Sequence, residues 1–226
     1  MGTLSLSKMG RLFWLGRYTE RVYTSLKLTR DILDADVDGT EADYAGYCRK
    51  TGIPNIYADT ADFCRRYYFD QADPCSILSS LGCAYDNAVV LRETLSTETL
   101  AYIQMAIYAM SIAAGSSAPG VALQWVLDDI MAFRGSAEER IGEEGSRAVL
   151  KAGASLERVD LYLRLDQPLA QVRGEFERLF DRLYKTQLHP DKARLDFLTD
   201  ALLDSAAALP PRAELIAAVE GLFPEV

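Results

Sequence analysis

Apolar residues recur at three- and four-residue steps along most of this chain, and glycine and proline interrupt them only sparsely. In residues 7–35 the recurring set on one side is Leu12, Leu15, Thr19, Val22, Tyr23, Leu26 and Leu33. A second set, Trp14, Leu28 and Ile32, lies on the opposite side. Because residues three and four apart share one face of an α-helix, this spacing predicts a long helix. A helix that is apolar on two faces is typical of a central rather than a peripheral position.

The same spacing predicts helices over residues 41–50, 58–69, 73–95, 96–115, 121–141, 146–165, 169–188, 191–207 and 212–222. In the helix over 73–95, Asp73 is expected to be the cap and Pro74 to lie in the first turn. No pair of strands is apparent. Because short connections between helices favour antiparallel neighbours, we expect an all-α, single-domain antiparallel bundle over residues 1–226. Two long central helices, 7–35 and 146–165, would be surrounded by several short peripheral ones.

Composition limits the function classes. The 226 residues are 49% hydrophobic, which is ample for one core, and carry a net charge of −9. Because a phosphate backbone would be repelled on average, a nucleic-acid partner is not expected. No apolar stretch has the roughly 20 residues that cross a bilayer, and residues 1–10 do not form a signal peptide. We therefore expect a cytoplasmic protein without a membrane partner, whose four cysteines are free and mostly buried.

One motif occurs twice. The sequence G-x-x-x-E-R-V spans residues 16–22 in the first long helix and 153–159 in the second. Gly and Glu four residues apart share one helix face, and a glycine there lets a neighbouring helix approach closely. Gly inside a helix costs about 1 kcal/mol relative to Ala, which close packing must offset. The repeat therefore predicts that the two long helices cross, with carboxylates beside the crossing.

The charged residues of the repeat lie on apolar stripes, where an unpaired charge is very costly. We expect Arg21 to pair with Glu157 and Arg158 to pair with Glu20, in a network that includes Arg17. Two interpretations stay open: a salt-bridge network that fixes helix register, or a pocket whose arginines grip an anionic ligand. Asp86 and Asn87, a polar insertion in the apolar helix over 73–95, are expected to join the same cluster.

These residues resemble the Alpha-E family, a bacterial helical domain named for its Glu-Arg motif. Residues 7–21, with Trp-Leu-Gly-Arg-Tyr ahead of Glu-Arg, resemble the opening signature of the family. Residues 86–88 with Arg92-Glu93 resemble its middle motif, and Gly145, Gly153 and residues 156–158 resemble its late motif. The chain departs from the family where arginines or a tryptophan are usual, at Tyr85, Val89, Ser146 and Ala154.

The resemblance implies a partnership with circularly permuted ATP-grasp ligases or transglutaminase-like proteins, in systems that make or modify peptides. We expect an accessory module that holds the partner or its anionic amino-acid or peptide substrate. One alternative is an enzyme in which Arg17, Arg21 and Arg158 clamp a small anion and Glu20 or Glu157 acts as acid or base, in a pocket that Asp86 and Asn87 help to line. A second alternative is a purely structural, oligomerising bundle. The oligomeric state is left open.

No cofactor or metal is expected. The only histidine, His189, precedes a proline in a predicted turn, so the Glu-x-x-His pairs of di-iron bundles are missing. Residues 34–39 match the first half of a calcium-binding loop, but Ala45 stands where its bidentate glutamate is needed. No glycine-rich phosphate loop is present.

Overall fold

The computed structural model describes residues 5–204 and 209–224, and within them it holds twelve helices and no strand. The all-α prediction is therefore confirmed. The chain divides into two compact units, Met1–Arg17 with Glu143–Val226 and Tyr18–Gly142. Helix α1, Leu6–Leu28, begins in the first unit and ends in the second. The expectation of a single domain over residues 1–226 stays a prediction.

The first unit is built around one long helix. Helix α9 (Glu144–Arg164) packs against α10 (Leu169–Leu183) and α12 (Arg212–Glu220), and α12 also contacts α11 (Lys192–Leu202). The first half of α1 adds Leu12, Phe13 and Leu15 to the core of this unit, and the ring of Phe13 meets that of Phe223 at 5.1 Å between centroids. The end predicted at residue 207 for the α11 segment lies outside the described residues.

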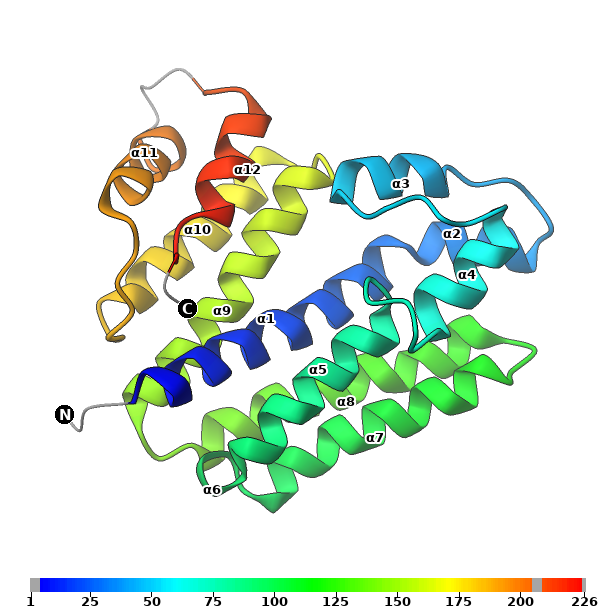
Figure 1. Ribbon diagram of the computed structural model, residues 1–226, viewed down its shortest axis with the longest axis horizontal. Coiled ribbons are helices and arrows are strands. Elements are labelled where there is room, and N and C mark those ends of the chain that lie inside the picture. The colour runs from blue at the N-terminus through cyan, green and yellow to red at the C-terminus, as the bar shows by residue number, and fades with distance from the viewer. Residues whose placement is uncertain (1–4, 205–208, 225–226) are drawn as a thin grey trace. The chain divides into compact units, whose positions relative to one another are not determined.

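The second unit contains the remaining helices: α2 (Arg30–Val37), α3 (Tyr44–Thr51), α4 (Thr60–Phe69), α5 (Ile77–Val90), α6 (Arg92–Leu95), α7 (Thr97–Ala114) and α8 (Pro119–Arg140). Figure 1 shows α7 and α8, in green, side by side along their length. Helix α5 packs on α7, and α4 packs on both α2 and α5. The short connection between α7 and α8 makes these two long helices antiparallel neighbours.

The prediction of one helix over residues 7–35 is wrong at Thr29, which separates α1 from α2. The Thr29 hydroxyl lies 2.8 Å from the Ser25 carbonyl oxygen, and the Tyr68 hydroxyl donates to the Thr29 carbonyl at 2.9 Å. Thr29 keeps its backbone bonds to Ser25 and from Leu33, at 2.9 and 3.2 Å, but its φ of −103° and ψ of 9° depart from helical values. The side-chain bonds add to the backbone bonds at this point. A tyrosine 39 residues away cannot be found by reading local periodicity.

The start predicted at Asp73 is also wrong. Helix α5 begins at Ile77, and its cap is Ser76, whose hydroxyl accepts from the Ser79 backbone N–H at 2.9 Å. The Asp73 carboxylate is buried and instead accepts from the Tyr57 hydroxyl at 2.7 Å and from the Cys75 backbone N–H at 2.9 Å. Leu91 further divides the predicted segment into α5 and α6.

All four cysteines are free, as expected, but only Cys48 and Cys64 are buried, while Cys83 is exposed. No helix in residues 5–204 and 209–224 combines the length and apolar character needed to cross a membrane.

Candidate functional site

The two glycines of the Glu-Arg repeat lie in a close crossing of α1 and α9 in the first unit. A Cβ added at Gly16 would overlap the carbonyl oxygen of Leu150 and lie 3.0 Å from the backbone nitrogen of Ala154. A Cβ added at Gly153 would overlap the carbonyl oxygen of Phe13. The obstacles are backbone atoms, so no side-chain rotation can relieve the overlap. The predicted helix crossing is therefore confirmed at both glycines.

Arg17 and Glu157 meet beside this crossing. The Arg17 Nε donates to Glu157 Oε2 at 2.7 Å, and the guanidinium lies over the Trp14 ring, 4.9 Å from its centroid. The Glu157 side chain is only 1% exposed, whereas 14% of the Arg17 side chain remains accessible. A charge-assisted bond of this length at an enclosed carboxylate ties the two helices together through the motif.

The buried charges continue along α9 to Asp160, one turn beyond Glu157. Arg164 Nε donates to both Asp160 oxygens, at 2.9 and 3.0 Å, and Arg164 also pairs with Glu220 of α12 at 2.5 Å. Burial raises the pKa of the Asp160 carboxyl, and the Glu157 charge adds to this, although Arg164 and Arg17 oppose it. Helix α9 thus carries two enclosed carboxylates, each held by an arginine.

A second cluster in the first unit joins α9 to α10. Arg158 Nη1 donates to Glu175 Oε1 at 2.7 Å, and Arg178 pairs with the same oxygen. Ser155 donates to the other Glu175 oxygen at 3.3 Å. Burial alone would raise the pKa of Glu175, but the guanidiniums of Arg158 and Arg178 bring it below its ordinary value. Arg158 is therefore engaged with a carboxylate of α10.

In the second unit, Glu20 is enclosed in the same manner. Arg134 of α8 donates from Nη2 to Glu20 Oε2 at 2.7 Å, and the Thr24 hydroxyl donates to Glu20 Oε1 at 2.6 Å. The Arg134 guanidinium also lies over the Tyr23 ring, 4.3 Å from its centroid. Glu20 is 0% exposed, whereas 24% of the Arg134 side chain is accessible. Both motif glutamates are thus buried while their arginine partners reach toward the surface.

The remaining predicted residues lie elsewhere in the second unit. The Arg21 guanidinium lies over the Tyr18 ring at 5.8 Å. Asn87 donates its side-chain amide to the Cys83 carbonyl of its own helix at 3.1 Å, and Asp86 is exposed on α5. Pairs of Arg21 with Glu157 and of Arg158 with Glu20 would join one unit to the other, so they stay predictions, as does a shared cluster with Asp86 and Asn87.

The sequence patterns did not predict Arg134 as the partner of Glu20, or Glu175 as the partner of Arg158. Glu175 follows Val172 by three residues and precedes Leu179 by four, so it lies on the buried stripe of α10. Arg134 likewise follows Ile130 by four residues and precedes Ala137 by three on the inner side of α8. In both helices the sequence signal is a charged residue on an apolar stripe, which indicates a buried charge but does not identify its partner.

These features define an all-α protein whose motif glutamates are enclosed and paired between helices. The sequence pattern of the Alpha-E family, described as "a predicted alpha-helical domain with a conserved ER motif", matches residues 7–210. The chain belongs to the Alpha-E family. No curated protein and no solved structure matches it.

Proposed function

We propose that this Alpha-E protein is an accessory binding module of a peptide-forming or peptide-modifying system, and that it associates with an ATP-grasp ligase. A transglutaminase-like protein is the other partner class that the family resemblance implies. In this proposal the Glu-Arg motif holds the helices in place and does not carry out a reaction. The chain acts by holding the ligase or the ligase's anionic amino-acid or peptide substrate.

The enclosure of both motif glutamates is the observation that carries this proposal. A general acid or base must come within hydrogen-bond reach of the proton that it transfers. Glu157 is 1% exposed and Glu20 is 0% exposed, and an arginine nitrogen lies 2.7 Å from each. An enclosed carboxylate bonded to a guanidinium is suited to fixing helix positions. This geometry favours a structural role for the motif over an acid–base role.

The enzyme alternative retains one supporting observation. Arg17 and Arg134 keep 14% and 24% of their side chains accessible while they hold the buried carboxylates. A guanidinium has five N–H donors, so a partly exposed one can bind an anion as well as its carboxylate. Anion binding at either arginine, each within its own unit, is therefore the second candidate, and it differs from the first in placing the ligand on the motif charges.

Both candidates are tested with the purified chain and the ATP-grasp ligase encoded nearest to it in its genome. Calorimetry and size-exclusion chromatography with light scattering are expected to show a complex. A matched thermal-shift series with amino acids, short acidic peptides and inorganic phosphate tests the ligand alternative. Failure of the ligase to bind, together with stabilisation by an anion that Arg17→Met abolishes, would overturn the accessory proposal. Self-association without either partner would favour a structural bundle instead.

A further inference from the structure

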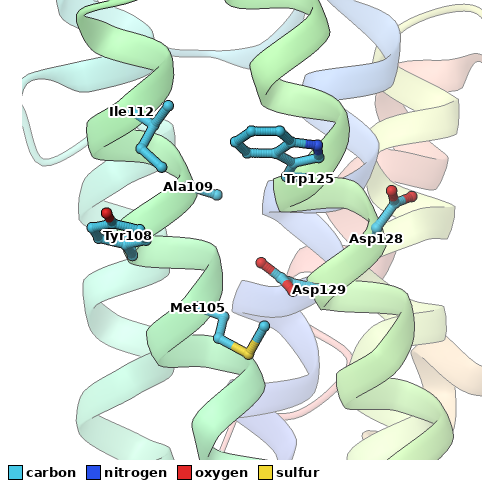
Figure 2. Close-up of a pocket in the computed structure, with 7 residues that line it drawn as sticks. All are labelled: Met105, Tyr108, Ala109, Ile112, Trp125, Asp128 and Asp129. Carbon is cyan, nitrogen blue, oxygen red and sulfur yellow. The ribbon is translucent and has the colours of Figure 1, made fainter.

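A groove between α7 and α8 exposes apolar and aromatic side chains. The residues that line it, called here the α7–α8 groove, are Met105, Tyr108, Ala109, Ile112, Trp125, Asp128 and Asp129. Figure 2 shows Trp125 and Asp129 extending from α8 toward α7, with Met105 extending from α7 below them. Residues 105, 108, 109 and 112 follow the i, i+3, i+4, i+7 spacing of a single helix face.

Three large side chains of the groove are mostly exposed instead of buried in the core. Tyr108 is 69% exposed, Trp125 is 53% exposed and Met105 is 51% exposed. Val121, one turn before Trp125 on α8, is a further exposed apolar residue, at 67%. Scattered apolar residues are ordinary on a surface, but a contiguous set with aromatic members marks an interaction site. Tyr and Trp are also enriched among residues that dominate binding energy.

Two neighbouring carboxylates border this apolar surface. Asp128 accepts a hydrogen bond from the Gln124 side chain at 2.8 Å, and within residues 5–204 and 209–224 no basic side chain pairs with Asp128 or Asp129. Partial burial, and then repulsion from Asp128, raises the pKa of Asp129. A cation placed at this border would offset the repulsion between the two carboxylates, so the charge complement of the groove is a lysine or arginine.

We propose that the α7–α8 groove docks an amphipathic helix of a protein partner, with apolar residues at i, i+3 or i+4, and i+7 and a Lys or Arg beside them. Two helices lying side by side offer a groove that a third helix fills. The flexible Met105 side chain adapts to differently shaped anchors. A second copy of this chain is a poorer occupant, because each copy carries a net charge of −9. This inference rests on the proposed function, because it supplies the docking surface of the module.

The test uses a display library of helical peptides about 18 residues long, roughly five turns, with randomised apolar and charged positions. Selection on the wild-type chain is followed by counter-selection on Trp125→Ser/Tyr108→Ser. Enriched peptides are expected to carry the stated apolar spacing with Lys or Arg beside it. Fluorescence anisotropy should then show that Trp125→Ser weakens the tightest peptide at least about tenfold. Tyr184→Ser, at a 76% exposed aromatic on the other unit, is the matched control and should have no effect.

The acidic border is tested separately. Asp128→Asn/Asp129→Asn should weaken the same peptide several-fold, and less so at about 0.5 M salt, because salt screens exposed charges. The control is Glu93→Gln, a change at an 89% exposed carboxylate outside the groove. Four results would each overturn the inference. Three concern the library: no enriched peptide, enriched acidic peptides, or enriched peptides that still bind the counter-selection variant. The fourth is a dimer of the wild-type chain that Trp125→Ser dissociates.

Failure of this inference can be told apart from failure of the proposed function. If Trp125→Ser leaves binding of the ATP-grasp ligase unchanged and no peptide depends on the groove, the docking inference fails and the accessory function stands. If selected peptides depend on the groove but the ligase does not bind the wild-type chain, the groove stands and the choice of partner fails.

Discussion

Gly16 and Gly153 are reciprocal partners in one helix crossing, since each lies against the carbonyl oxygen of the residue three positions before the other. Phe13 precedes Gly16 by three residues, and Leu150 precedes Gly153 by three. The two copies of the G-x-x-x-E-R-V motif thus meet at their glycines, and each glycine makes the same contact with the opposite helix. The ion pair of Arg17 with Glu157 follows directly after this contact and uses one residue from each copy.

Alanine at either glycine is expected to destabilise the protein. Alanine normally stabilises a helix interior by about 1 kcal/mol relative to glycine, but overlap with backbone atoms typically costs about 1–3 kcal/mol and can cost more. Gly16→Ala and Gly153→Ala should therefore lower the free energy of unfolding measured with urea. Gly174→Ala in α10 is the control, because nothing lies within 4 Å of its added Cβ. It should be neutral or stabilising, and equal effects at all three positions would refute the close crossing.

Removing both members of the Arg17–Glu157 pair should cost less than the two single losses added together. Loss of one partner of a buried pair costs about 3–5 kcal/mol because a charge is left uncompensated. Arg17→Met and Glu157→Gln should each lower the unfolding free energy, and the double variant should lose less than the sum of the two. The exposed pair Lys185–Glu144, with 60% and 57% exposed side chains, provides the reference cycle. Its coupling should be at most about 1 kcal/mol.

Thr24→Val tests the second enclosed glutamate without altering its charge. The Thr24 hydroxyl donates to Glu20 Oε1 at 2.6 Å in a buried setting, and a hydrogen bond to a charged group contributes about 1.5–3 kcal/mol. The variant should lose that order of stability in thermal or urea unfolding. Ser111→Ala removes a hydroxyl that donates to the Tyr108 carbonyl on the exposed side of α7, and it should change stability little. A similar loss in both variants would show that the buried bond from Thr24 to Glu20 stabilises the protein no more than an exposed hydroxyl bond does.

Protonation of Glu175 should lower the free energy of unfolding at acidic pH. Its pKa in the folded state lies below the ordinary value of 4.5, so the unfolded chain binds a proton at higher pH than the folded chain does. The resulting stabilisation is complete above pH 4.5 and is lost as the pH falls through the lower folded pKa. Unfolding free energies of wild type and Glu175→Gln, measured from pH 7 to pH 3, should therefore converge on acidification. A difference that stays constant across this range would contradict the ion pairing of Glu175 with Arg158.

Local sequence patterns predicted the helices well because the helical period is a short-range signal. They also predicted the crossing at Gly16 and Gly153, since a glycine on an apolar helical stripe favours the close approach of another helix. They failed where distant residues contribute, as at Thr29 between α1 and α2, where the Tyr68 hydroxyl donates to the backbone carbonyl. The partner of Glu20 was missed for the same reason, because Arg134 lies 114 residues away and no periodicity relates the two.

In the proposed function the motif charges hold the fold and do not carry the activity. The most direct test is the affinity of the Arg17→Met/Glu157→Gln double variant for the neighbouring ATP-grasp ligase, measured by calorimetry on protein whose circular dichroism matches wild type. We expect a lower unfolding free energy with a dissociation constant within about threefold of wild type, a difference below about 1 kcal/mol. A variant that is fully folded but no longer binds the ligase would contradict this proposal.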